Sequence, residues 1–415
     1  MRVLHLTTEF PPVIYGGLGT ATGGLVKALA KSGVETAVLL FGPTSGSSYG
    51  QFRPLASAVA RKRRRRAYGV TIFEVSWFLD PATIAAIAAK WRPDILHLHS
   101  FWIWPIAEHL RRVLGVPLVY TVHSLDRAEY EIGAGPPQCI GQWDVQQAVI
   151  YGADRVVSLT NSERDLLEEY CPGVDQRIRV VGNGIEDVEP VRRAKRGDRD
   201  APVVLFSGRF VDRKGIWELI KAIEIVLNEA PQVKFVLAGG HRGCPGSQME
   251  AWLLPERLHR FRPNIQFTGW LTPGQLNAWY RAADILVVPS WYEPFGMVVL
   301  EGMINGLAVA ASAIGGPAEI LDHGKTGLLF PARDADALAL AILELSRDRN
   351  LRVRLAAAGA AAVREAWLWP KVVEKMLLVY DDAISNQAGH RVAPATAWCR
   401  ERPTQSSWAS VRSPR

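Results

Sequence analysis

The stretch VVLFSGRFVDRKGIWELIKAI, from Val203 to Ile223, places an apolar run, a glycine-bearing turn and a helical pattern in direct succession. The apolar run Val203–Ser207 is typical of a buried strand, and Ile216–Glu229 is typical of the helix that follows it. The turn Gly208–Gly215 (GRFVDRKG) therefore lies at the carboxyl end of the strand. Such a unit predicts a parallel sheet covered by helices.

The same alternation extends along the chain on both sides of this unit. On the N-terminal side the predicted strands are Val3–Leu6, Thr36–Leu40, Val70–Val75, Ile95–Leu98, Leu118–Val122 and Arg155–Leu159. The helices predicted between them are Thr20–Lys31, Pro81–Lys90, Pro105–Leu114, Val145–Tyr151 and Ser162–Tyr170. On the C-terminal side the predicted strands are Lys234–Ala238, Ile265–Phe267, Ile285–Val288 and Ala308–Ala311. The helices predicted there are Pro273–Arg281, Met297–Asn305, Asp334–Ser346 and Leu351–Val363.

The composition divides this alternation into two series. Residues 183–202 are rich in turn residues and charges and are predicted to form a linker between an N-terminal domain (1–182) and a second domain (203–366). A last helix is predicted over 367–385, and the tail 386–415 loses all periodicity and is expected to be disordered. The predicted fold class is α/β, with two doubly wound Rossmann-like domains facing across a cleft. Ligands of such sheets bind at the carboxyl ends of the strands.

Composition excludes several classes of protein. The formal net charge is +7, but much of the excess lies in Arg61–Arg66 (RKRRRR), so we expect no nucleic-acid partner. That run favours a solvated loop, with weak contact to a membrane surface as the alternative. No apolar run reaches the roughly 20 residues of a membrane span, and the N-terminus is typical of a first strand. Four widely spaced cysteines favour a reducing, cytoplasmic location.

Two turns are candidate anion sites. Gly16-Gly17 follows the first strand and precedes a helix, so that backbone N–H groups and the positive helix end could bind a phosphate. An ordinary strand-to-helix turn is the alternative, because the spacing is not that of the dinucleotide fingerprint. In GRFVDRKG, Arg209 can grip phosphate oxygens as a fork and Lys214 can act as a point charge. A solvated turn with Asp212 paired locally is the alternative there.

The stretch SWYEPFGMVVLEG, from Ser290 to Gly302, carries two glutamates in apolar surroundings. Burial of an unpaired carboxylate is costly, so Glu301 needs either solvent or a polar partner. Glu293 is predicted to lie at the mouth of the helix Met297–Asn305, and Glu301 on its second turn. Two such carboxylates could bind hydroxyls on different parts of one ligand, such as a sugar and a ribose joined by a diphosphate. An exposed helix position is the alternative for Glu301.

The pattern E-P-F-G-x-x-x-x-E in this stretch resembles the signature of retaining nucleotide-sugar glycosyltransferases with the GT-B fold. Within that fold it is similar to glycosyltransferase family four, whose relatives include glycogen and starch synthases. The resemblance covers about residues 1–385. The other motifs that match in the family's order are the Gly16-Gly17 loop, TVHS at Thr121–Ser124, VGNGIE at Val181–Glu186, GRFVDRKG, TGWL at Thr268–Leu271 and GGPAEIL at Gly315–Leu321.

The resemblance implies a role for each matching position. Arg209 and Lys214 would hold the donor diphosphate, Glu293 the donor sugar and Glu301 the ribose, while His123 would face the reacting sugar. The implied catalytic residues are His123, Arg209, Lys214 and Glu293. The implied donor-binding residues are Gly16, Gly17, Arg209, Lys214, Gly269, Trp270, Glu293, Phe295, Gly296, Met297 and Glu301. Asn183, at the interdomain crossing, is a weaker candidate.

The expected activity is transfer of a sugar, with retention, from a nucleotide-diphosphate donor to an acceptor hydroxyl on a small molecule, lipid or glycan. A UDP-sugar is the expected donor, with no cofactor and no metal, and the expected location is the cytoplasm or its membrane surface. The segment LDRAEYEIGAGPPQC after Ser124 is expected to form an acceptor loop. An α-glucan synthase is one alternative, although Ile14 stands where those enzymes carry a lysine. A non-catalytic sugar-nucleotide-binding scaffold is another.

Two weaker patterns bear on metals. The acidic pairs Asp198-x-Asp200 and Asp334-x-Asp336 match those of metal-dependent sugar transferases, but the second begins a helix, where aspartate is favoured by the helix dipole. His97-x-His99 puts two imidazoles on one face of a strand, with no third ligand evident from the sequence. Packing or lining of the cleft is therefore the preferred role of these histidines.

Overall fold

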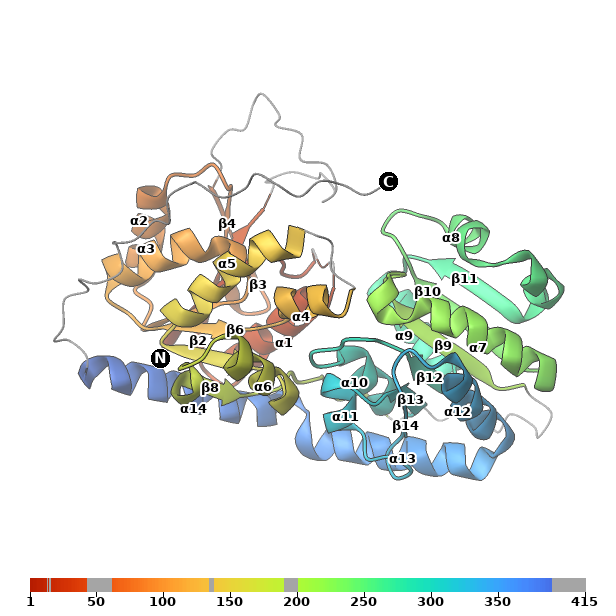
Figure 1. Ribbon diagram of the computed structural model, residues 1–415. Helices are drawn as coiled ribbons and strands as arrows, with labels where there is room; N and C mark the ends of the chain where they lie inside the picture. Colours follow the sequence, from red (N-terminus) through yellow and green to blue (C-terminus); the bar gives the residue numbers. More distant parts are fainter. Residues whose placement is uncertain (13, 15, 43–61, 134–137, 190–200, 390–415) are drawn as a thin grey trace, which may run out of the picture.

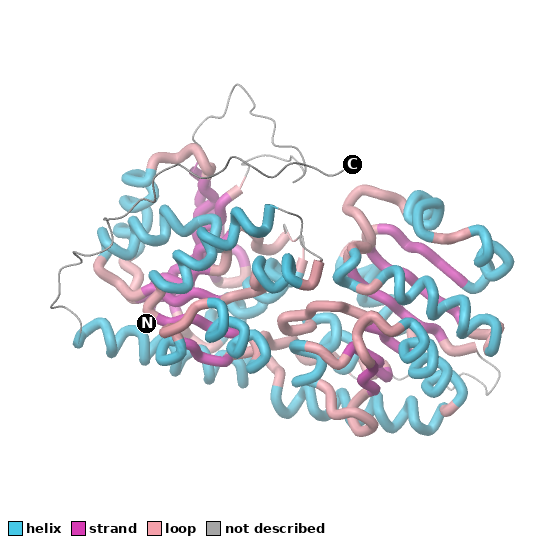
Figure 2. Tube along the Cα trace, in the orientation of Figure 1, coloured by secondary structure: helices cyan, strands magenta, loops and turns pink. Residues whose placement is uncertain are grey.

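The computed structural model describes residues 1–12, 14, 16–42, 62–133, 138–189 and 201–389. They form two α/β domains, each built around one sheet with helices on both faces (Figures 1 and 2). The predicted fold class, two Rossmann-like domains, is confirmed.

The first domain contains an eight-stranded sheet with the strand order β3-β4-β2-β1-β5-β6-β7-β8. Its strands are β1 (Arg2–Thr7), β2 (Glu35–Phe41), β3 (Lys62–Ala67), β4 (Val70–Val75), β5 (Ile95–Leu98), β6 (Leu118–Thr121), β7 (Arg155–Ser158) and β8 (Ile178–Val180). Its helices are α1 (Gly17–Lys31), α2 (Pro81–Trp91), α3 (Trp104–Leu114), α4 (Asp126–Glu131), α5 (Gln138–Gly152) and α6 (Asn161–Tyr170). Among the described strands of this sheet, only β3 runs antiparallel to its neighbour, and the order reverses between β1 and β5.

The second domain contains a six-stranded parallel sheet with the order β11-β10-β9-β12-β13-β14, which reverses between β9 and β12. Its strands are β9 (Val203–Gly208), β10 (Lys234–Gly239), β11 (Ile265–Gly269), β12 (Ile285–Val288), β13 (Ala308–Ser312) and β14 (Leu328–Phe330). Its helices are α7 (Ile216–Glu229), α8 (Gly246–Leu253), α9 (Pro273–Ala282), α10 (Met297–Ile304), α11 (Gly315–Ile320), α12 (Ala335–Arg347) and α13 (Arg349–Ala366). A reversal of strand order is where an open α/β sheet binds its ligands.

The basic run is a strand and not a loop. The expectation of a solvated loop at Arg61–Arg66 was wrong, because Lys62–Ala67 pairs antiparallel with β4 at the edge of the first sheet. Most side chains of β3 are exposed, whereas Arg65 is partly buried and its Nε donates to Glu74 Oε1 across the pair at 2.5 Å. Charges are common on edge strands, where they prevent pairing with other chains. Arg61 itself lies outside the described residues.

The chain crosses between the domains twice, and the two crossings pair with each other. The Ile185 N–H donates to the Trp367 carbonyl at 2.8 Å, and the Trp369 N–H donates to the Ile185 carbonyl at 3.2 Å. A Cβ on Gly182 would lie 2.5 Å from the Trp367 ring and 2.6 Å from Phe295, so the crossing leaves no room for a side chain there. Of the predicted linker, residues 190–200 lie outside the described residues, as does the tail from residue 390.

After the second crossing, α14 (Trp369–Gly389) lies along the first domain, whereas α13 lies along the second (Figure 1). Its buried face packs on residues of α1, β1 and β5; the contributing side chains of α14 are Trp369, Val372, Val373, Met376, Val379, Tyr380 and Ala383. Among the described residues, no helix has both the length and the apolar character needed to span a bilayer.

A charged clamp fixes α14 to the first sheet. Asp382 accepts hydrogen bonds from Arg155 at 2.6 and 2.9 Å and from Arg179 at 2.6 Å. The hydrogen bond from Arg155, with the charges of both arginines, lowers the pKa of Asp382 to about 2. Folding therefore favours the ionised carboxylate.

Replacing Asp382 by asparagine should lower the free energy of unfolding by about 1–3 kcal/mol at neutral pH, because charge-assisted hydrogen bonds are lost. Since the pKa is depressed in the folded chain, the contribution should be complete above about pH 4 and lost as the pH falls through about 2. Urea unfolding measures both effects. The matched control is Asp381→Asn, which removes an exposed neighbouring charge. Equal losses in the two variants would contradict the clamp.

Candidate active site

The loops after β9 and β12 carry the predicted phosphate-binding and sugar-binding residues, and they meet where the strand order reverses. Lys214, from the turn after β9, donates its Nζ to Glu293 Oε2, from the loop after β12. Ser290 Oγ donates to the same carboxylate oxygen at 3.1 Å. Two residues that are 79 positions apart in the sequence thus form one ion pair, in which Glu293 is buried and Lys214 is partly buried.

Glycine at position 215 makes this contact possible. Gly215 has a φ of 69°, and a Cβ there would lie 1.8 Å from the Pro289 carbonyl oxygen. The two loops also share a backbone hydrogen bond, from the Trp291 N–H to the Arg213 carbonyl at 2.7 Å. Any larger residue at 215 would separate Lys214 from Glu293.

Another glycine, Gly316, lies against the backbone of the loop that carries Glu293. The Gly316 N–H donates to the Glu293 carbonyl at 2.9 Å, and a Cβ on Gly316 would lie 1.8 Å from the Phe295 carbonyl oxygen. The loop then turns through Gly296, at a φ of 94°, into α10, which begins at Met297. The first turn of α10 has neither a side-chain cap nor an acidic residue. The Val299 N–H donates to the Gly296 carbonyl at 2.8 Å, which leaves the N–H groups of Met297 and Val298 to face an anion.

The electrostatics of the pair favour two ions. Burial raises the pKa of Glu293, but the Lys214 ammonium outweighs this effect and the pKa lies below its ordinary value. Burial also lowers the pKa of Lys214, and Glu293 opposes that shift. A buried carboxylate and a buried ammonium depend on each other, because removing either partner leaves an uncompensated charge.

Two arginines surround the pair. Arg209 is exposed, although the protein around its guanidinium, and then the charge of Arg213, lower its pKa. Arg213 is 13% exposed and its Nε lies 3.5 Å from Glu129 Oε2 of the first domain. Arg213 was not predicted from the sequence, although it lies in the same turn as Arg209 and Lys214. Together Arg209, Arg213 and Lys214 present three cationic side chains around Glu293.

Glu301 has a polar partner in the described residues. The Tyr280 hydroxyl, on α9, donates to Glu301 Oε2 at 2.6 Å. Glu301 is half-buried and its pKa is raised by burial, so the alternative of an exposed helix position was wrong. The sequence indicated the need for a partner but not its identity, because Tyr280 lies on another helix.

The remaining donor-binding candidates lie at the ends of other strands. Gly269, with a φ of 70°, ends β11 and is followed by the half-buried Trp270. Gly16 and Gly17 are exposed at the start of α1, where a Cβ would meet no described residue outside the local chain within 4 Å, and the first turn of α1 has no acidic residue. Within the described residues, none of these four positions hydrogen-bonds to the Lys214–Glu293 pair.

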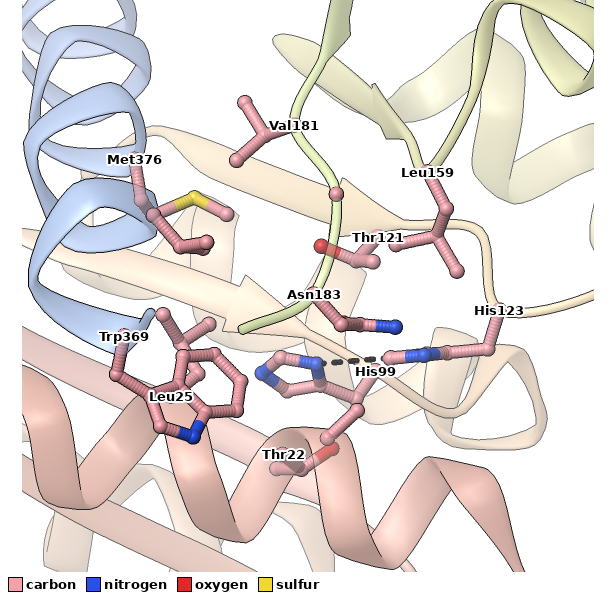
Figure 3. A pocket seen from close by; sticks show the side chains of 13 residues that line it. Thr22, Leu25, His99, Thr121, His123, Leu159, Val181, Asn183, Trp369 and Met376 are labelled. Carbon is pink, nitrogen blue, oxygen red and sulfur yellow. Dashed lines mark hydrogen bonds between the residues drawn. The ribbon is translucent and has the colours of Figure 1, made fainter. Parts of the chain in front are cut away.

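His123 and Asn183 line a small cavity of about 10 Å³ in the first domain (Figure 3). Thr22, whose Oγ1 is buried without a partner among the described residues, lines it as well. The space is about that of one water molecule. His99 also faces this cavity and hydrogen-bonds to His123, at 3.2 Å between Nδ1 and Nε2.

A third imidazole does lie beside His97 and His99, contrary to the expectation from the sequence. It is His5, on β1, directly opposite His97 in the parallel pairing of β1 with β5. Sequence reasoning missed it because the order of the strands was unknown. Both ring nitrogens of His97 are already hydrogen-bonded, to the Tyr380 hydroxyl at 2.6 Å and to Thr121 Oγ1 at 2.7 Å. The cluster is therefore organised as a hydrogen-bonded network.

Neither acidic pair forms a described metal site. Asp334 caps α12, since its Oδ1 accepts from the Ala337 N–H at 2.8 Å. Asp198 and Asp200 lie outside the described residues, as do residues 134–137 of the expected acceptor loop.

The first domain holds the glutamate loop directly. The Tyr292 hydroxyl donates to Glu163 Oε2 at 2.8 Å and accepts from the Leu125 N–H at 3.0 Å. Thr160, the N-cap of α6, donates its Oγ1 to the Pro294 carbonyl at 3.1 Å. Burial raises the pKa of Glu163 to about 7. The position of Glu293 is thus tied to the way the domains meet.

Protonation of Glu163 should stabilise the folded chain, because it removes a charge that burial disfavours. Because its pKa is raised in the folded chain, its contribution is complete below about pH 4.5 and is lost as the pH rises through about 7. The shift corresponds to up to about 3 kcal/mol. Relative to Glu163→Gln, the wild-type melting temperature should fall between about pH 5 and 8. Glu169→Gln, at an exposed position of α6, is the control and should keep the wild-type profile. Parallel profiles for wild type and Glu163→Gln would refute this interpretation.

Each of the two domains matches a different family model. Residues 15–189 match the model described as Glycosyltransferase Family 4, and residues 187–362 match the model described as Glycosyl transferases group 1. The chain is 30% identical over 357 residues to alpha-maltose-1-phosphate synthase of Mycolicibacterium smegmatis, covering 81% of this chain and 87% of that one. It is 28% identical over 355 residues to glycogen synthase of Mycobacterium tuberculosis, covering 81% and 84%.

Solved structures show the same fold. Sucrose-phosphate synthase from Thermosynechococcus elongatus has a TM-score of 0.75 at 22% identity, covering 93% of this chain and 99% of that one. The Anabaena protein HepE, in complex with UDP-glucose, has a TM-score of 0.69 at 19% identity, covering 92% and 100%.

Proposed function

The chain belongs to glycosyltransferase family four, and from this we propose that it transfers a sugar, with retention of configuration, from a nucleoside-diphosphate donor to an acceptor hydroxyl. The observation that carries the proposal is the partly buried Lys214–Glu293 pair at the reversal of strand order in the second sheet. It joins a cation suited to phosphate with a carboxylate suited to sugar hydroxyls, and Arg209 lies in the same turn as Lys214.

In this proposal the donor lies along the carboxyl ends of the second sheet. Arg209 and Lys214 bind the diphosphate, together with the N–H groups of Met297 and Val298 at the start of α10. Glu293 binds the sugar and Glu301 the ribose, while Gly269 and Trp270 flank the base. A UDP-sugar is the proposed donor, supported by the similar fold of HepE in complex with UDP-glucose. Gly16 and Gly17 approach the donor from the first domain.

Retention is proposed to follow from attack on the face that the diphosphate leaves. The bond between the anomeric carbon and the phosphate oxygen breaks, with its electron pair passing to the diphosphate. The acceptor oxygen bonds to that carbon, and its proton passes to the departing phosphate oxygen. Glu293 Oε2 accepts hydrogen bonds from Lys214 and Ser290, which lower the nucleophilicity of that oxygen. Stabilisation of the departing charge by cations supplies much of the catalysis.

Two alternative functions, an α-glucan synthase and a non-catalytic scaffold, can be distinguished by experiment. The relatives named alpha-maltose-1-phosphate synthase and glycogen synthase favour an α-glucan substrate, whereas Ile14 in place of a lysine argues against one. A non-catalytic scaffold would bind a donor without turning it over. Thermal shift with UDP-, GDP-, ADP- and dTDP-sugars, followed by donor hydrolysis and an α-glucan acceptor assay, separates the three.

A cytoplasmic location with weak membrane-surface contact through the basic edge strand is also proposed. Lys62, Arg63 and Arg64 are exposed on β3, and Phe78, which is 67% exposed, follows the neighbouring strand β4. Anionic lipid attracts such clusters. Lack of co-sedimentation with anionic vesicles at low salt would remove this part of the proposal.

Replacing Glu293 or Glu301 by glutamine should change different kinetic constants. Glu293→Gln should lower kcat by about 100-fold, because misplacing the reacting sugar loses orientation. Glu301→Gln should mainly raise KM for the donor, because the ribose is remote from the bond that breaks. Tyr280→Phe is the matched variant, since it removes the partner of Glu301, and it should raise KM less. Steady-state kinetics with varied donor measure all three. Wild-type constants for Glu301→Gln would exclude a ribose site there.

Turnover should survive EDTA. The basis is the set of cations at Arg209, Arg213 and Lys214, which can neutralise the leaving diphosphate without a metal. Initial rates with and without chelator should agree within about twofold, well below the effect of losing one charge-stabilising group. Loss of activity on chelation, restored by magnesium or manganese, would require a metal in the mechanism.

A further inference from the structure

Three imidazoles of the first domain form a hydrogen-bonded line that ends at His123. His5 Nδ1 lies 3.0 Å from His99 Nε2, and His99 Nδ1 lies 3.2 Å from His123 Nε2 (Figure 3 shows the second bond). His5 and His99 are buried, whereas His123 is partly exposed. The line therefore runs from the interior of the sheet to the surface where a ligand is proposed to bind.

All three rings are neutral near pH 7. Burial lowers the pKa of His5 to about 3 and that of His123 to about 4, and burial with the neighbouring imidazoles lowers the pKa of His99 well below its ordinary value. A neutral imidazole carries one N–H donor and one acceptor nitrogen. Only two arrangements then satisfy both hydrogen bonds. Either every ring donates from Nδ1 toward His123, or every ring donates from Nε2 toward His5.

The free end of the line distinguishes the two arrangements. His5 Nε2 is buried and has no hydrogen-bond partner among the described residues. If the rings donate toward His5, this atom is an N–H group without an acceptor. If they donate toward His123, it is only an unused lone pair. Buried N–H groups without partners are rare, so the second arrangement is favoured.

Neighbouring groups keep the line rigid. The His97 ring centroid lies 4.1 Å from that of His99, and His97 is held at both nitrogens by Tyr380 and Thr121. His5 and His97 occupy paired positions on adjacent strands. His99 therefore has little freedom to turn away from His5 or from His123.

We propose that His5 and His99 are positioning residues that hold His123 as its Nδ1–H tautomer, so that His123 offers an N–H donor to an oxygen of the reacting sugar. His123 Nε2 is occupied by His99, and Nδ1 has no hydrogen-bond partner among the described residues. In this tautomer His123 is a hydrogen-bond donor and not a base. The catalytic consequence rests on the proposed function, whereas the tautomer itself does not.

The tautomer can be measured without substrate. The full chain is labelled with ¹⁵N in the histidine rings, and the His123 signals are assigned by their loss in His123→Gln. The expected wild-type spectrum shows a protonated Nδ1 and an unprotonated Nε2 on His123. A protonated Nε2 would overturn the proposal, without any need for a variant of His5. Bound zinc on these rings would overturn it as well.

Two variants of His5 test the relay. His5→Asn can keep an N–H donor where Nδ1 stood, whereas His5→Leu cannot. His5→Leu should turn the His123 signals into a mixture of tautomers and lower kcat by about tenfold, the cost of one oriented hydrogen bond, with donor KM nearly unchanged. His5→Asn should keep the wild-type tautomer and most of kcat. An unchanged tautomer in folded His5→Leu overturns the relay. If no donor supports transfer by the wild type, the proposed function fails while the tautomer measurement still stands.

Discussion

The ion pair between Lys214 and Glu293 is the constraint on which the rest of the second domain's binding face depends. Glu293 is buried and Lys214 is partly buried, so loss of either partner would leave a poorly solvated charge uncompensated. The pair forms only if the loops after β9 and β12 touch, and Gly215 permits that approach because a Cβ would strike Pro289. Gly316 likewise permits close contact with the glutamate loop, because a Cβ there would strike the Phe295 carbonyl oxygen. Two glycines that are typical of ordinary turns in the sequence thus allow Lys214 and Glu293 to come together.

The same loop connects the candidate active site to the domain interface. Tyr292 and Pro294, on either side of Glu293, both hydrogen-bond to the first domain, and Phe295 packs against Trp367 at the second crossing. Across the interface, His5 lies on β1, while His99 and His123 follow the carboxyl ends of β5 and β6 in the first sheet. Each domain therefore contributes a rigid, pre-arranged polar group, and the position of one domain on the other determines how the two groups face a shared ligand.

The sequence predicted regular elements well where a local pattern determines them. The apolar run of β4 and the amphipathic helix α7 were placed with the observed bounds, Val70–Val75 and Ile216–Glu229. The partners of the site residues could not be predicted, because they depend on strand order and helix packing: Tyr280 beside Glu301 is an example. The edge strand Lys62–Ala67 was missed because its charged side chains lack the apolar pattern of a strand. Most of them face solvent, while the backbone pairs with β4.

The most direct measurement of the central claim is a crystal structure with UDP bound. We expect diphosphate oxygens within hydrogen-bond distance of Arg209 and Lys214, and the ribose hydroxyls hydrogen-bonded to Glu301. Glu293 should stay beside Lys214, facing the space where a sugar would continue from the diphosphate. A diphosphate bound away from the reversal between β9 and β12, with the Lys214–Glu293 pair untouched, would contradict the account.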